Sequence, residues 1–235
     1  MRFLMLGCLL LLGCHKNKSV APEPLYQEQW ALHYDQAFYE AYEIDVDAHI
    51  HGDQVLNTYT GKGVKVAVID IGLDKNHPEF KQNITHAINS ADGSDDTSCS
   101  HSSDCYHGTA VTGIIAANAN GLGLRGIAPD SQITFIKLDL AGYVGDDEIL
   151  NALDYAEQFD VDIVSNSWGT EDVSPVVQEK IDGLFCDEKG YVITNATLFL
   201  EKEIKILIKD DVAKILENEL SKYSKFYKCS VKTDK

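Results

Sequence analysis

The chain has 235 residues, 44% of them hydrophobic, and is therefore long enough to bury the core of one domain. Its 37 acidic and 20 basic residues give a net charge of −17, which argues against nucleic-acid binding because phosphate recognition needs a cationic surface. An acidic surface suits calcium or basic substrates, and it also suits solubility alone.

The N-terminus has the pattern of a targeting segment. Met1 and Arg2 precede an apolar run over residues 3–12, which is too short to span a bilayer comfortably. Gly13 and Cys14 follow this run. The pattern resembles a bacterial lipoprotein signal peptide over residues 1–13, with a lipid on Cys14; an ordinary secretory signal is the alternative. We expect a lipoprotein anchored to a membrane of the bacterial cell envelope, facing the periplasm or the exterior.

Export would place the later cysteines in a compartment that permits disulfides. Cys99 and Cys105 are close in sequence, so we predict a local bridge between them. The alternative is a zinc site that also includes His101 and His107, although this spacing matches no common zinc pattern.

Strand and helix patterns alternate after a polar tether over residues 14–23. A β-branched run predicts a buried strand over 64–69, with Asp70 at its carboxyl end. Small and apolar residues over 109–119 predict a helix that begins near His107. Further strands are expected over 133–138 and 161–166 and from residue 190 to 194, and further helices over 146–159 and 176–185. This alternation predicts an α/β fold with a mostly parallel sheet.

The composition changes after Gly190, the last of the 17 glycines. Residues 196–235 hold nine lysines and seven acidic residues, with apolar residues on one helical face. We interpret residues 195–235 as a lysine-rich helical tail, either a frameshifted or replaced end or an appended helix.

Two motifs carry a family resemblance. The first runs from Val66 to Asp74 and continues as His77-Pro78-Glu79; the second begins His107-Gly108-Thr109. Together they resemble the Asp and His segments of the subtilisin-like serine proteases (peptidase S8), most closely the kexin-like branch. The resemblance covers residues 24–194 and implies a partial subtilisin-like three-layer fold. It also implies that Asp70 orients an imidazole and that His107 is the catalytic base. Ile71 departs from the usual small or polar residue, and Ala110 stands where many members have a second histidine.

The same resemblance implies a substrate-binding segment and a calcium site. Ser167, Trp168 and Gly169 would pair with the substrate backbone as an added strand. The acidic Glu171 and Asp172 would favour a basic substrate side chain or form a solvated turn. The calcium ligands would be Glu79, Asn118, Asn120, Leu122 and Leu124.

The family's serine is missing from this chain. The serines after Asn195 are Ser221, Ser224 and Ser230, and none follows Gly-Thr. We therefore expect a serine-type endopeptidase relative, truncated before its nucleophile and inactive alone on peptide or protein substrates. The alternatives are half of a split protease completed by a second chain, a non-catalytic peptide-binding envelope lipoprotein, or a decayed gene.

Overall fold

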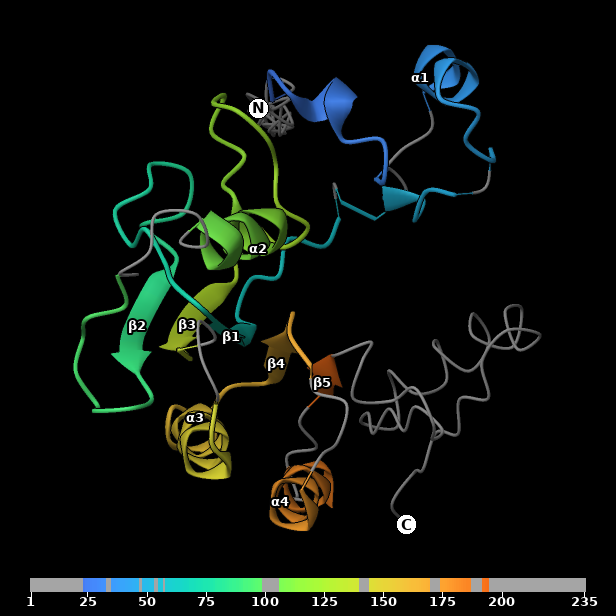
Figure 1. Ribbon diagram of the computed structural model, residues 1–235. Helices are drawn as coiled ribbons and strands as arrows, with labels where there is room; N and C mark the ends of the chain where they lie inside the picture. The colour runs from blue at the N-terminus through green and yellow to red at the C-terminus, as the bar shows by residue number, and fades with distance from the viewer. Residues whose placement is uncertain are drawn as a thin grey trace, which may run out of the picture.

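The computed structural model describes residues 23–32, 35–46, 48–52, 55–56, 58–98, 106–139, 144–169, 174–186 and 192–194. The residues of the predicted signal peptide, Cys14, Cys99, His101, Cys105, Glu171, Asp172 and the lysine-rich tail lie outside these residues. The elements follow in chain order in Figure 1: η1 (Tyr26–Glu28), α1 (Gln36–Ala41), β1 (Lys65–Asp70), β2 (Ile84–Asn89), α2 (Tyr106–Ala116), β3 (Gln132–Lys137), α3 (Asp146–Gln158), β4 (Ile163–Asn166), α4 (Pro175–Cys186) and β5 (Val192–Thr194).

The five described strands form one parallel sheet in the order β2-β3-β1-β4-β5. The central strand β1 is buried from Val66 to Asp70, as its β-branched sequence predicts. In register, Asp70 lies beside Lys137 of β3, and Ile69 lies beside Asn166 of β4. Asp70 therefore ends the middle strand at the carboxyl edge of the sheet, where α/β folds place functional groups.

Helices cover both faces of the sheet, which gives the expected three layers (Figure 1). On one face α2 packs over a core that includes Val68, Phe135 and Ala116. On the other face α3 and α4 pack over a core that includes Ile69 and Val164. Alternate residues of β1 supply the two cores because strand side chains point to opposite faces.

Some elements differ from the sequence prediction. β2 was not predicted, because it is an edge strand whose Thr85 and His86 are exposed and whose apolar pattern is weak. The short helix α1, which Asp35 caps by accepting a hydrogen bond from the Phe38 N–H at 2.7 Å, was also missed. The helix after the His motif begins at Tyr106 and ends at Ala116, before the predicted residue 119. It ends there because the Asn118 N–H turns to the Glu79 carbonyl at 2.7 Å.

The N-terminal segment is tied to the loop that follows α2. The Leu25 N–H donates to the Gly123 carbonyl at 2.8 Å. The Gln29 side-chain amide both donates to the Arg125 carbonyl and accepts from the Arg125 N–H, at 2.8 and 3.0 Å. This pairing fixes the loop that holds the predicted calcium ligands. No helix in the described part of the chain is both long and apolar enough to span a bilayer.

Candidate active site

Asp70 is fully buried, with 0% of its surface exposed. Its Oδ1 accepts a hydrogen bond from the Ile71 backbone N–H at 2.8 Å. The isoleucine that departs from the family pattern thus still supports the carboxylate through its backbone. Its apolar side chain offers no donor, and Asp70 Oδ2 is buried without a partner among the described residues.

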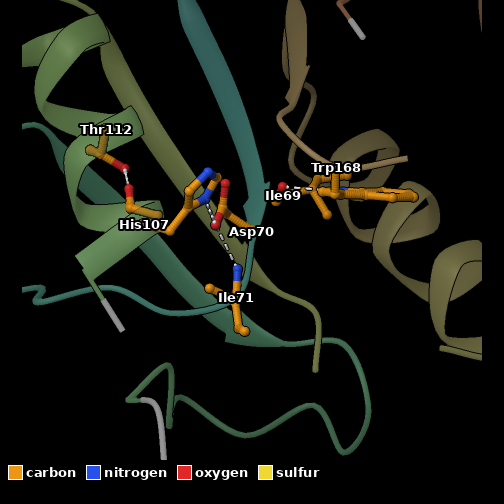
Figure 2. A network of polar contacts seen from close by, with 7 residues as sticks. Ile69, Asp70, Ile71, His107, Thr112 and Trp168 are labelled. Atoms are coloured by element: carbon orange, nitrogen blue, oxygen red, sulfur yellow. Dashed lines mark hydrogen bonds and ion pairs between the residues drawn. The ribbon is translucent and has the colours of Figure 1, made fainter. Parts of the chain in front are cut away.

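His107 is the second residue of α2, and its imidazole points at Asp70 (Figure 2). The His107 Nδ1 lies 2.8 Å from Asp70 Oδ1, while the His107 side chain is 52% exposed. Because the ionised carboxylate can only accept, the Nδ1–H donates, and this leaves Nε2 able to take a proton from a group on the solvent side. The structure therefore brings the two predicted residues into the arrangement of a carboxylate that orients a general base.

Close packing of α2 at Gly108 holds His107 beside Asp70; these two residues are called the dyad below. A Cβ at this position would lie 2.4 Å from the Gly72 carbonyl oxygen and 2.9 Å from Phe135 Cζ, so only glycine lets α2 pack this tightly. The neighbouring Thr109 Oγ1 accepts the Asp74 N–H at 2.9 Å. These contacts lock the first turn of α2 onto the loop after β1, which sets the position of His107 relative to Asp70.

The predicted substrate-binding residues follow β4, the strand next to β1. Ser167 and Gly169 are exposed, whereas Trp168 is half-buried between them and packs against the core beneath α3 and α4. Trp168 Nε1–H donates to the Ile69 carbonyl at 3.0 Å, as Figure 2 shows. The segment therefore lies at the same sheet edge as Asp70.

Two of the predicted calcium ligands contact Glu79: the Asn118 N–H donates to the Glu79 carbonyl at 2.7 Å, and the Asn120 side chain hydrogen-bonds to the Glu79 carboxylate. The Glu79 Oε2 is buried and has no partner among the described residues. Burial raises the pKa of Glu79, and the nearby Glu23 carboxylate raises this pKa further, against opposing contributions from His77 and the Asn120 side chain. An unpaired carboxylate oxygen facing a second carboxylate is a local excess of negative charge that a cation would relieve.

Glu23 was not predicted as a ligand. It was assigned to the tether, yet it is 5% exposed, and both of its oxygens accept the Gly121 N–H, at 3.0 and 2.9 Å. The sequence signal was an acidic residue directly before the family-like start at Pro24. Within the described ranges, no three His, Cys, Asp or Glu side chains form a group that could hold a metal. A cation here would therefore depend on two carboxylates together with amide and carbonyl oxygens of the loop over residues 118–124, a donor set typical of calcium.

A parallel α/β sheet with an Asp–His pair at its carboxyl edge is an arrangement in which hydrolases orient a general base. The family model named Peptidase_S8, described as the subtilase family, matches residues 61–198. That match spans more than half of the chain, and the chain belongs to the subtilase family.

Similar proteins agree with this assignment. The major intracellular serine protease of Bacillus subtilis is 36% identical over 124 residues, which are 52% of this chain and 39% of that protein. Furin-like protease 2 of Drosophila melanogaster is 34% identical over 156 residues, covering 65% of this chain and 9% of that protein.

Solved structures show the same fold. Fervidolysin from Fervidobacterium pennivorans, a keratinolytic enzyme related to subtilisin, superposes with a TM-score of 0.55 at 27% identity, covering 73% of this chain and 24% of that one. The Aeromonas sobria serine protease, solved in complex with the chaperone ORF2, superposes with a TM-score of 0.52 at 30% identity, covering 69% and 29%. The chain thus spans less than half the length of each of these relatives.

Proposed function

We propose that this chain supplies the base and the orienting carboxylate of a subtilase-type serine endopeptidase, and that it does not hydrolyse peptides by itself. The observation that carries the proposal is the 2.8 Å contact between His107 Nδ1 and the buried Asp70 carboxylate, with the imidazole open to solvent. Asp70 holds the imidazole in the tautomer whose Nε2 is unprotonated. His107 then takes the proton of an attacking hydroxyl and returns it to the leaving amine.

The nucleophile is the part that the 235 residues do not supply. Ser221, Ser224 and Ser230 lack the Gly-Thr context that precedes the catalytic serine in the family. Asn195 also lacks the Ala-Gly-Asn context of the family's oxyanion asparagine. A base needs a nucleophile within about 2.6–3.2 Å to activate it.

The first test uses the purified chain alone. We expect no hydrolysis of fluorescein-labelled casein or of peptides with Lys or Arg before the cut. We also expect no labelling by a fluorophosphonate, because labelling requires a serine hydroxyl activated by His107. Casein hydrolysis that disappears in both Asp70→Ala and His107→Ala would refute the proposal.

A second polypeptide, or further residues of the same protein, would complete the enzyme. Such completion is favoured by the exposed face of α2 beside His107, where Tyr106 is 65% and Ile114 57% exposed. Large exposed apolar side chains on one face are typical of a surface that another polypeptide segment covers. A chaperone in complex with the related Aeromonas sobria protease suggests that a partner chain assists folding of this protein as well. Without a nucleophile from elsewhere, the chain would act as a non-catalytic peptide-binding lipoprotein that uses residues 167–169.

We propose calcium as the ligand of the Glu79 region. Glu23 and Glu79 would supply carboxylate oxygens, and Asn118, Asn120, Leu122 and Leu124 would supply amide or carbonyl oxygens. The Asn118 side-chain NH₂ donates to Asn83 Oδ1 at 2.7 Å and to the Pro129 carbonyl at 2.9 Å, and the Asn118 main-chain carbonyl accepts the Asn120 N–H at 2.9 Å. The Asn118 Oδ1 is therefore the oxygen that we propose as the ligand. Bound calcium would stabilise the contacts between the N-terminal segment and the loop that follows α2.

The proposed anchor is tested at Cys14. The mature protein should partition with membranes and incorporate radiolabelled palmitate, because a lipid on Cys14 provides the apolar anchor. Cys14→Ala should abolish the label, whereas Cys8→Ala, a change inside the predicted signal peptide, should leave it intact. Equal labelling of the Cys14→Ala protein would exclude the lipoprotein proposal.

The proposed disulfide between Cys99 and Cys105 is tested on exported protein. Mass spectrometry of an unreduced digest with trypsin and Glu-C should find the two cysteines linked. A loop this short should contribute about 2–3 kcal/mol at most to the free energy of unfolding. Free thiols at both positions would reject the bridge.

Placement in the kexin-like branch stays a prediction from the sequence. The furin-like relative is 34% identical and the Bacillus subtilis intracellular protease is 36% identical, so overall identity favours neither branch.

A further inference from the structure

Trp168 lies where the chain leaves β4 and begins the exposed segment next to the dyad. Its neighbours Ser167 and Gly169 face solvent, whereas the Trp168 ring packs inward against the core that includes Ile69 and Val164. The segment over residues 167–169 is therefore held in place by its middle residue, and the residues on both sides of it are exposed to solvent.

The indole contacts β1 at the place where backbone pairing with β4 ends. The Asp70 carbonyl accepts the Leu138 N–H at 2.9 Å, so it points toward β3. Successive carbonyls of a strand point to opposite sides, which directs the Ile69 carbonyl toward β4. Ile69 and Asn166 are the last paired residues of the two strands. The Trp168 N–H reaches this carbonyl at 3.0 Å, one residue before Asp70 (Figure 2).

We propose that Trp168 is a positioning residue, whose indole N–H fixes the peptide-binding segment relative to the Asp70–His107 dyad; this inference rests on the proposed function. One hydrogen bond joins the segment to the strand that ends in the orienting carboxylate. The Ser167 and Gly169 backbones then face solvent in a fixed place, ready to pair with an extended peptide. A segment ordered before binding loses less conformational entropy when the peptide arrives, which strengthens binding.

If Trp168 had only a structural role, packing of its ring would be sufficient and the indole N–H would not matter. A substitution that removes the N–H and keeps the ring therefore distinguishes the positioning role from the structural one. Benzothienylalanine at position 168 keeps the two-ring shape and replaces the N–H with sulfur. Trp30→Phe serves as the matched control, because Trp30 is the only other tryptophan and lies in an aromatic cluster with Phe38. The same control assigns the two indole signals in an NMR spectrum.

The hydrogen bond itself is tested first. In the full chain labelled with ¹⁵N-tryptophan, the Trp168 indole proton should exchange with solvent more slowly than the Trp30 indole proton. Exchange of the Trp168 proton as fast as in free tryptophan would overturn the proposal.

The functional consequence is tested with fluorescein-labelled casein as an extended polypeptide probe, by fluorescence anisotropy. The benzothienylalanine protein should bind about fivefold more weakly than the unsubstituted chain, as expected for one neutral hydrogen bond, whereas Trp30→Phe should bind equally well. Unchanged affinity would overturn the positioning role, and so would an equal loss of affinity in Trp30→Phe.

Failure of casein to bind to the unsubstituted chain would count against the proposed function. The positioning role would then be decided by comparing the NMR signals of the His107 imidazole in the unsubstituted and the benzothienylalanine proteins. A change of these signals in the benzothienylalanine protein supports coupling of Trp168 to the dyad, and unchanged signals refute it.

Discussion

Casein hydrolysis should appear when this chain is combined with a polypeptide that carries the serine segment of a subtilase, and His107→Ala should then lower turnover about 10⁶-fold. That factor is the loss that follows removal of the base in a subtilisin, where serine and base act as one unit. Asp70→Asn should lower turnover about 10⁴-fold, because an amide at this position favours the wrong imidazole tautomer. The combined protein is assayed for turnover with each variant in turn.

His86→Ala is the matched control for this experiment. His86 is exposed on β2, where its ring stacks on Phe159 with the ring centroids 4.2 Å apart, and it takes no part in the dyad. Turnover should be unchanged in this variant. Turnover that survives His107→Ala would contradict the assignment of the base, and failure of every serine-bearing partner to restore hydrolysis would favour the non-catalytic alternative.

The sequence was sufficient to predict the core of the site because its signals are local. A β-branched run that ends in Asp70 specifies a buried strand with a carboxylate at its end. The small residues after His107 specify a helix that packs closely. The family resemblance supplied the relation between the two motifs, and the structure places their side chains 2.8 Å apart.

The contacts that hold the site were not predictable because they join residues distant in sequence. The Trp168 indole reaches Ile69, and Glu23 reaches Gly121, each across nearly one hundred positions. The need for glycine at position 108 is visible only when the Gly72 carbonyl is seen 2.4 Å from where a Cβ would lie. The periodicity of apolar residues carries no information on such long-range contacts, since it indicates which face of an element is buried and not which residues pack against that face.

Glu79 and the neighbouring Glu23 should make the stability of the calcium-free protein depend on pH. Burial and Glu23 raise the pKa of Glu79 above its ordinary value of 4.5, so the folded state binds the proton more tightly than the unfolded state. The stability from this group is therefore fully present below about pH 4.5 and is lost as pH rises through the raised pKa. Relative to Glu79→Gln, the free energy of unfolding of the unsubstituted chain in EGTA should fall over that interval.

Calcium should reverse this loss because it stabilises the ionised form of Glu79. At a calcium concentration one hundred times its Kd, the gain is about 2.7 kcal/mol. For a domain of this size such a gain corresponds to a rise in Tm of roughly 5–10 °C at pH 7. The rise should be smaller near pH 4.5, where the site must first release its proton.

Variants assign the effect to the two carboxylates. Glu79→Gln and Glu23→Gln should each reduce the calcium-induced rise in Tm, whereas Glu179→Gln on the exposed face of α4 should not. Magnesium should have a weaker effect, because it requires octahedral geometry and releases its water reluctantly. An equal rise in Tm in Glu79→Gln and in the unsubstituted chain would place any calcium elsewhere. The orphaned Glu79 oxygen would then be a net cost of folding, and Glu79→Gln should stabilise the protein at pH 7 whether or not calcium is present.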